Sequence, residues 1–350
     1  MFKKWGIVFA ISLLALAACS KEEVIEEEAG EVSEELEEVE EIVEEEVALP
    51  FMAPFTGVGS EQEVTQRAIL VTMNNHPSAR PQSGIAQADV VYEMLAEGNV
   101  TRFLALYQSE IPDLIGPVRS ARDYFVNIAK GLDAFYIAHG YSPAAQKMLN
   151  AKVVDNINGM QYDGTLFHRS KERKAPHNSY ITKDKIFAGA EKVGASMELK
   201  KTPVFSFYDS IEGAKLGQPV SSVSVQYGSG SSFENQYTYI AEEGIYERKT
   251  AGILTTDKET AEPVKLANLV FMEIPHKVID NSGRQEITLT EGGRAYLFQA
   301  GLMKEIEWEN VDGILIPMEN GVPVKLVKGK TWISFVPTKT GLEGMVNFLP

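Results

Sequence analysis

The chain has 350 residues and a formal net charge of −16 at pH 7, and most of that charge lies in one segment. Residues 21–47 hold fifteen Glu and one Lys, which give −14, and residues 1–20 carry +2, so residues 48–350 carry only −4. Because the remaining chain has no basic surplus, we predict no nucleic-acid partner. Cys19 is the only cysteine, so the sequence excludes an intrachain disulfide, a cysteine nucleophile and a thiolate metal site in the mature chain.

Residues 1–18 are typical of an export signal peptide. Lys3 and Lys4 precede an apolar stretch over residues 6–18, which is shorter than the about 20 residues that a membrane-spanning helix needs. The stretch ends in Leu16-Ala17-Ala18-Cys19, the pattern of a lipobox. We therefore predict cleavage before Cys19, a lipid such as palmitate on that cysteine, and location on the extracytoplasmic face of the cell membrane. The alternative is an ordinary secretory signal with a chance cysteine.

Residues 19–50 are predicted to be the lipidated cysteine followed by a Glu-rich tether. Apolar residues follow helical spacing at Ile25, Val32, Leu36, Val39 and Val43. The Glu residues around them repel one another at i,i+4 spacing and have no Lys to pair with. We expect an extended, partly helical spacer, and the alternative is a helix that joins a coiled-coil partner.

Residues 51–200 are predicted to form a mixed α/β domain. Gly98-Asn99 is typical of a hairpin turn, Gly116-Pro117 is typical of a helix start, and Ser142 and Thr182 are expected to cap two further helices. The expected strands are 67–73, 89–96, 101–108 and 134–138.

Residues 201–350 are predicted to form a β-rich domain, because short β-type segments alternate with Gly and Pro. The expected fold class is therefore an α+β, or mixed α/β, N-terminal domain followed by a β-rich C-terminal domain. The expected strands are 204–208, 222–227, 236–240, 269–274, 286–289, 295–298, 314–317 and 331–336.

Several common catalytic motifs are missing from the sequence. Residues 227–233 lack the third glycine of a dinucleotide loop, and Gly329-Lys330-Thr331 has Val324 where a phosphate loop needs glycine. The sequence contains no H-E-x-x-H, S-x-x-K or G-x-S-x-G pattern. We therefore predict no cofactor and no metal.

Three arginines stand close together in the first predicted domain. Arg102 lies on an expected strand, and Arg119 and Arg122 share one face near the expected helix start. Two cations there oppose the helix dipole at about 0.3–1 kcal/mol each, which an anionic ligand would offset. The alternative is a counter-charge within the protein, supplied by Asp89, Glu93, Glu97 or Asp123.

A second cluster of polar residues, His168 to Asn178, lies in a predicted loop at residues 167–180. His139 ends an expected strand before a helix, where α/β proteins often bind ligands, although a buried structural histidine is the alternative. A zinc site from His168 and His177 lacks a third ligand at a recognisable spacing. The candidate ligand-binding residues are Arg102, Arg119, Arg122, His139, His168, Arg169, Arg173, His177 and Asn178.

The sequence resembles the YerB-like lipoproteins, a two-part domain family of unknown function. The resemblance implies a two-part extracytoplasmic lipoprotein and brings no established activity. It covers residues 55–350 and rests on Arg80-Pro81-Gln82-Ser83-Gly84, Ala88-Asp89-Val90-Val91-Tyr92-Glu93, Thr101-Arg102-Phe103, Gly116-Pro117-Val118-Arg119-Ser120-Ala121-Arg122, Ala175-Pro176-His177-Asn178 and Gly329-Lys330-Thr331-Trp332-Ile333.

A second resemblance is to the LytR-CpsA-Psr phosphotransferases of the cell envelope. Thr101-Arg102 followed by residues 117–123 is similar to their arginine and Pro–Arg–Asp segments, which grip a polyprenyl pyrophosphate. Phe103 replaces the aspartate that this family places after the first arginine. The departure puts metal binding and catalysis in doubt.

The leading functional prediction is a non-catalytic, lipid-anchored envelope protein. It would bind an anionic cell-wall polymer or a protein partner through the arginines and histidines. The rival prediction is an envelope enzyme that transfers a phosphoryl group on a lipid-linked pyrophosphate. Acidic residues that could hold a divalent cation near the arginines would favour the enzyme, and the candidates are Asp89, Glu93 and Asp123.

Overall fold

A mostly β architecture is seen in the computed structural model, which describes residues 49–201 and 205–350. The predicted signal peptide, Cys19 and tether lie outside these residues, and so does Val204 of one expected strand. No helix in the described ranges is long and apolar enough to cross a membrane.

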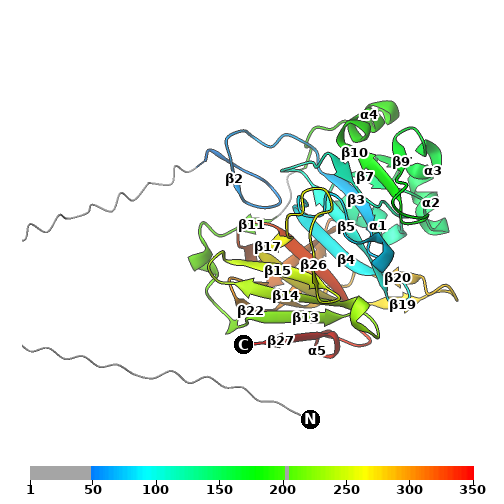
Figure 1. The fold of residues 1–350 in the computed structure, drawn as a ribbon. Helices are drawn as coiled ribbons and strands as arrows, with labels where there is room; N and C mark the ends of the chain where they lie inside the picture. Colours follow the sequence, from blue (N-terminus) through cyan, green and yellow to red (C-terminus); the bar gives the residue numbers. More distant parts are fainter. Residues whose placement is uncertain (1–48, 202–204) are drawn as a thin grey trace, which may run out of the picture. The chain divides into compact units, whose positions relative to one another are not determined.

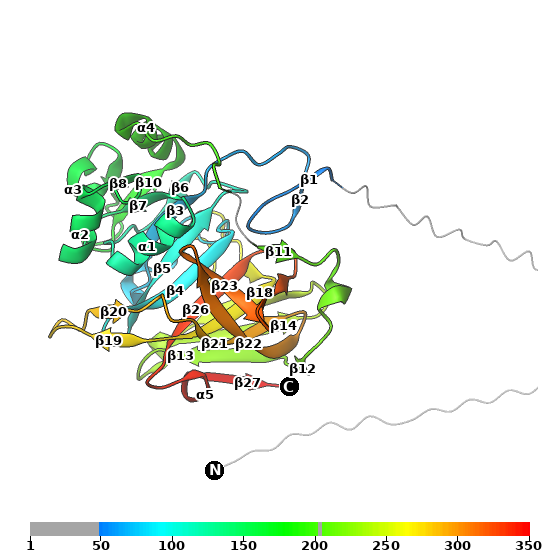
Figure 2. The ribbon, with the colours of Figure 1, turned by 180° about the vertical axis from the view of Figure 1, so that it is seen from behind.

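The largest sheet in the described chain has twelve strands drawn from both parts of the sequence (Figures 1 and 2). In spatial order they are β24 (Val322–Pro323), β23 (Ile314–Glu319), β22 (Leu302–Val311), β21 (Gly293–Gln299), β18 (Asn268–Ile274), β26 (Thr331–Pro337), β4 (Val90–Glu97), β5 (Val100–Tyr107), β3 (Ile69–Asn74), β7 (Phe135–Ala138) and β8 (Asn156–Asn158), with β12 (Gln218–Pro219) beside β22.

Strand β26 joins the two parts of this sheet. It pairs in parallel with β18 on one side and with β4 on the other, so Trp332 lies opposite both Leu269 and Val91. Residues 51–200 and 201–350 therefore share one sheet, while the division of the chain into two domains at residue 200 stays a prediction.

A second sheet of six strands packs on one face of the large sheet (Figure 1). Tyr237 of this sheet packs edge-on against Phe271 of the large sheet, with ring centroids 5.9 Å apart. Its strands are β16 (Ile253–Leu254), β15 (Ile245–Thr250), β14 (Glu234–Ile240), β13 (Ser222–Gln226), β27 (Val346–Leu349) and β17 (Lys265–Leu266).

The opposite face of the large sheet is covered in part by helix α1, whose buried Phe125 and Ile128 join a core with Leu104 and Tyr136. Among the residues that the structure describes, every α-helix of more than four residues lies between residues 123 and 193. The helices are α1 (Asp123–Gly131), α2 (Pro143–Asn150), α3 (Gly159–Tyr162), α4 (Lys183–Val193) and α5 (Leu342–Met345). The remaining strands of the described residues form small sheets. One has three strands, β6 (Leu114–Ile115), β10 (Ser179–Thr182) and β9 (Phe167–Arg169). The two-stranded sheets pair β1 (Phe51–Met52) with β2 (Gly59–Ser60), β11 (Ser206–Phe207) with β25 (Lys325–Leu326), and β19 (His276–Val278) with β20 (Gln285–Ile287).

The expected helix start at Gly116-Pro117 is wrong. Residues 117–122 are extended because their backbone groups bond to neighbouring segments: the Arg119 N–H donates to the Thr72 carbonyl, and the Val118 N–H donates to the Ser179 carbonyl. Helix α1 begins at Asp123, with Arg122 as its N-cap residue. The helix-dipole argument therefore does not apply to Arg119.

Two other local predictions have different outcomes. Ser142 caps α2 as expected, because its hydroxyl accepts the Ala145 N–H. Residues 167–180 are not a continuous loop, since both ends of this segment form the antiparallel strands β9 and β10. Ser179 is consequently buried at the start of β10.

Candidate functional site

A β-bulge in the β4–β5 hairpin sets the position of the first carboxylate in the candidate site. Met94 pairs with Arg102 and Leu95 with Thr101, but Glu97 then pairs with Val100, so Ala96 is an extra residue. Side chains alternate between the two faces of a strand, and the extra residue reverses this alternation. Glu97 therefore lies on the same face of the hairpin as Arg102.

Glu97 is the shared partner of two of the predicted arginines. Arg102 Nη2 lies 3.1 Å from Glu97 Oε1, and Arg122 donates to the same oxygen. Burial raises the pKa of Glu97, but the charges of Arg102, Arg122 and Arg119 outweigh it and lower that pKa overall. Burial lowers the pKa of Arg102 to about 9. Of the four acidic residues considered as internal counter-charges, Glu97 is therefore the one that pairs with Arg102 and Arg122.

Arg119, the third predicted arginine, has no such partner. It is half-buried, its Nε is buried without a hydrogen-bond partner, and it forms no ion pair within the described residues. Burial lowers its pKa, Glu97 raises it, and the charges of Arg122 and Arg169 lower it further. The three arginines and Glu97 therefore leave a surplus of positive charge around Arg119.

His139 lies beside this group at the end of β7. Its Nδ1 is 2.6 Å from Ser179 Oγ, and its Nε2 is 2.7 Å from Arg169 Nη2. A guanidinium only donates, so Nε2 accepts and the ring is neutral. Burial lowers the pKa of His139 to about 4, and the Arg169 charge acts in the same direction. A side chain at position 159 would collide with this ring, so Gly159 makes room for it.

A pair of stacked histidines lies near Arg119, and one of them, His76, is not among the residues predicted from the sequence. The rings of His76 and His177 have centroids 4.5 Å apart and planes 26° apart. His76 Nδ1 accepts the Ser78 N–H at 3.1 Å, so its neutral ring carries the proton on Nε2. Burial lowers the pKa of both histidines, and the Arg119 charge contributes to both shifts.

The other predicted residues have mainly internal contacts. Arg173 donates to the Ala79 carbonyl at 2.9 Å and to the Pro81 carbonyl at 2.6 Å, and so holds the segment that follows His76. Asn178 donates to the Ser170 carbonyl at 3.1 Å and accepts from Arg169. His168 is exposed and stacks on Tyr180.

The three candidate metal-binding carboxylates occupy separate places. Asp89 accepts the backbone N–H groups of Gln108 and Ser109 at 2.7 and 2.9 Å. Asp123 is the first residue of α1, and Glu93 lies in a buried network on the opposite face of the hairpin from Glu97. Within the residues described, no group of three His, Cys, Asp or Glu side chains could hold a metal ion.

Glu93 is completely buried and accepts five hydrogen bonds. Arg248 and Trp332 donate to Oε2, each at 3.0 Å. Asn75, Thr101 and Asn235 donate to Oε1 at 3.2, 2.8 and 3.1 Å. Arg248 is not among the residues predicted from the sequence, and the structure places it on the buried face of β15 together with Tyr246 and Thr250.

Comparison with known proteins agrees with the two-part description. Residues 55–196 match the N-terminal domain, and residues 223–333 the C-terminal domain, of the protein family of unknown function DUF3048. The chain is 39% identical over 339 residues to "Putative lipoprotein YerB" of Bacillus subtilis strain 168, covering 96% of both chains. The crystal structure of YerB from Bacillus subtilis superposes with a TM-score of 0.78 at 40% identity, covering 85% of this chain and 99% of that one. The chain therefore belongs to the DUF3048 family, together with YerB of Bacillus subtilis.

Proposed function

We propose that this protein is a lipid-anchored extracytoplasmic lipoprotein that binds an anionic cell-envelope ligand beside Arg119. The observation that carries the proposal is that Arg119 is a half-buried cation without an ion-pair partner in the described chain. The nearby carboxylate of Glu97 is already shared by Arg102 and Arg122. An uncompensated charge of this kind is costly unless an anion pairs with it.

Neighbouring donors support an anion that carries phosphate-type oxygens. The His76 ring carries its proton on Nε2 in the neutral form, and the His177 ring stacks on it. A guanidinium and imidazole N–H groups are suited to a phosphate or pyrophosphate oxygen. In this proposal, Arg102 and Arg122 hold the extended segment 117–122 in place and Arg119 contacts the ligand.

Anchoring is proposed from the lipobox and from the relative whose name contains the word lipoprotein. A Cys19→Ala chain should stay unprocessed or leave the membrane fraction, because the thiol that takes the lipid is gone. Metabolic labelling with a fatty-acid analogue measures this directly. Label that persists in the Cys19→Ala chain would contradict the anchoring proposal.

Binding is tested by calorimetric titration of the full chain, in detergent micelles, with pyrophosphate. Arg119→Gln should weaken binding at least tenfold because it removes the unpaired charge. Arg294→Gln is the matched control, since Arg294 is half-exposed and pairs with Glu343 elsewhere. Equal affinity of the two variants, or no binding by the parent chain at millimolar pyrophosphate, would contradict the proposal.

The same site predicts a pH dependence that the histidines cause. Both histidines have lowered pKa values, so they gain charge only as the solution becomes acidic. Affinity for sulfate, which keeps its charge in this range, should rise between pH 7 and pH 5. The rise should flatten in a His76→Gln, His177→Gln double variant. A parent chain whose sulfate affinity is constant with pH would remove the histidines from the site.

The phosphoryl-transfer alternative has no specific observation in its favour. It needs carboxylates that hold a divalent cation near the arginines, and Asp89 and Glu93 are engaged by other groups. The likeness to the envelope phosphotransferases stays a prediction.

A further inference from the structure

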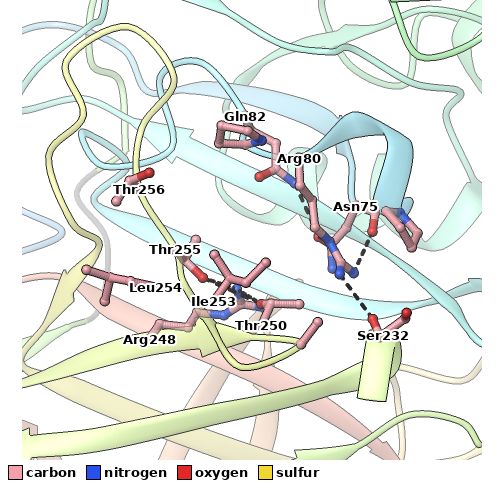
Figure 3. Close-up of a pocket in the computed structure, with 13 residues that line it drawn as sticks. Asn75, Arg80, Gln82, Ser232, Arg248, Thr250, Ile253, Leu254, Thr255 and Thr256 are labelled. Atoms are coloured by element: carbon pink, nitrogen blue, oxygen red, sulfur yellow. Dashed lines mark hydrogen bonds between the residues drawn. The ribbon is translucent and has the colours of Figure 1, made fainter. Parts of the chain in front are cut away.

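A cavity of about 290 Å³ lies between two segments that are distant in sequence, and neither Arg119 nor the stacked histidines line it. Residues 75–82 form one side, residues 248–256 form the other, and Ser232 lies between them (Figure 3). The volume is at the small end of ligand-binding pockets, about 300–1,000 Å³. The cavity therefore fits a small molecule rather than a polymer.

Much of the cavity wall is apolar. Pro77 and Pro81 contribute from the first segment, and Ala251, Ile253 and Leu254 contribute from the second. Ile253 is 73% exposed although it is a large aliphatic residue. An exposed aliphatic side chain beside a cavity suits contact with an apolar group of a ligand.

Arg80 supplies the charge in this cavity. Its Nε and Nη2 donate to the Oδ1 and carbonyl oxygen of Asn75 at 3.0 and 2.9 Å, and its Nη1 donates to the Ser232 carbonyl at 3.0 Å (Figure 3). All of these acceptors are neutral, and Arg80 forms no ion pair in the part of the chain that is described. A guanidinium has five N–H groups, so one remains free on each Nη.

The second arginine of the cavity is already compensated. Arg248 pairs with Glu93 at 3.0 Å, and its Nη1 donates to Thr255 Oγ1 at 2.9 Å. Arg80, Arg248 and Glu93 together therefore carry one net positive charge. Burial and the Arg248 charge together lower the pKa of Arg80 to about 10, because both disfavour its charged form and outweigh the opposing effect of Glu93.

We propose that this cavity binds a small organic monoanion, a carboxylate with an apolar body. Arg80 binds the carboxylate through its free N–H groups, and Ile253, Leu254 and the two prolines contact the apolar body. A single carboxylate matches the one uncompensated charge. This site shares none of its proposed contacts with the Arg119 site, so the two proposals can fail separately.

The experiment is calorimetric titration of the full chain in detergent micelles, with the heats of empty micelles subtracted. Hexanoate is the probe, hexanamide is the uncharged analogue, and hexyl phosphate tests a different anion. Hexanoate should bind at least tenfold more tightly than hexanamide, because only the carboxylate pairs with Arg80.

Two variants separate the cavity from general surface binding. Ile253→Asp puts a competing carboxylate at the cavity and should weaken hexanoate binding at least tenfold without disturbing the core. Val322→Asp is the matched control, because Val322 is 63% exposed and does not line the cavity. Its hexanoate affinity should equal that of the parent chain.

Three results would overturn the proposal. The first is that hexanoate does not bind at millimolar concentration, and the second is that hexanoate and hexanamide bind with equal affinity. The third is that Ile253→Asp and Val322→Asp lose the same amount of hexanoate affinity. Hexyl phosphate binding tenfold more tightly than hexanoate would overturn the carboxylate assignment. Arg80→Gln adds a check: its loss should be larger for hexanoate than for hexanamide, which a merely structural role of Arg80 would not produce.

Discussion

Glu93 and Glu97 lie four residues apart on β4, and each pairs with arginine, yet their surroundings differ. Glu93 has no exposed surface and five donors, whereas the side chain of Glu97 is 38% exposed and is shared by Arg102 and Arg122. The bulge at Ala96 places the two carboxylates on opposite faces of the hairpin. Glutamate–arginine pairing alone therefore does not identify a functional site; the balance of charge around the pair does.

The two clusters differ most in that balance. Around Glu93, the Arg248 charge is neutralised, and the guanidinium also stacks over Trp332 at 4.4 Å. Around Glu97, three arginines meet one carboxylate, which leaves Arg119 unpaired. We expect the Glu93–Arg248 pair to govern stability and the unpaired Arg119 beside Glu97 to govern binding of the envelope anion.

The largest effect should come from Glu93→Gln. Removing one partner of a buried ion pair leaves Arg248 uncompensated and should lower the free energy of unfolding by about 3–5 kcal/mol. Denaturant unfolding measures the change. Glu305→Gln is the matched control, since Glu305 lies 3.9 Å from Arg294 in an exposed pair and should cost under about 1 kcal/mol. Similar losses in both variants would contradict the structural role of Glu93.

A second change at the buried cluster makes that prediction more specific. Adding Arg248→Met to Glu93→Gln removes the stranded charge, so the double variant should lose less stability than the sum of the two single variants. Additive losses in a double-mutant cycle would show that the two side chains do not act as a pair.

Glu97→Gln should have a smaller effect, about 1–2 kcal/mol, because water screens a partly exposed pair. The pKa of Glu97 is lowered in the folded chain, so its contribution is present above its unfolded pKa and is lost as the pH falls through the folded value. The difference in unfolding free energy between parent and Glu97→Gln should therefore shrink on going from pH 6 to pH 3. A difference that stays constant over this range would show that the charge of Glu97 contributes nothing.

Arg119→Gln should have the smallest effect on stability, within about 0.5 kcal/mol. Its guanidinium has no ion-pair partner to lose in the described chain, and the loss of its longer-range attraction to Glu97 is offset by relief of burial and of repulsion by Arg122 and Arg169. Thermal melts of Arg119→Gln and Arg102→Gln provide the comparison, with the larger loss expected for Arg102→Gln. A larger loss for Arg119→Gln would mean that Arg119 is structural.

Local patterns predicted much of this structure. The hairpin turn at Gly98-Asn99, the cap at Ser142 and the position of His139 after a strand all depend on neighbouring residues, and the structure agrees with each. The strands of residues 222–336 follow from short β-type segments between Gly and Pro. The part of the chain that the structure describes is mostly β, and the mixed α/β class expected for residues 51–200 stays a prediction.

Long-range pairing explains what could not be predicted. Residues 117–122 carry a helical apolar pattern, but hydrogen bonds to Thr72 and Ser179 keep them extended. Glu97 was one of four candidate counter-charges, and only the bulge singles it out. Arg80 and Arg248 are 168 positions apart and meet only because β15 packs over the hairpin, so no local spacing links them.

The parallel pairing of β26 with β4 and β18 also determines when the protein can fold. The central strand of the large sheet is made from residues 331–337, which are synthesised after both of the strands that it joins. Until these residues arrive, β4 and β18 present bare edges to other chains, which is a known route to aggregation. The large sheet therefore stays incomplete until residues 331–337 have joined it, and a chain that stops before residue 331 would leave the facing edges of β4 and β18 permanently open.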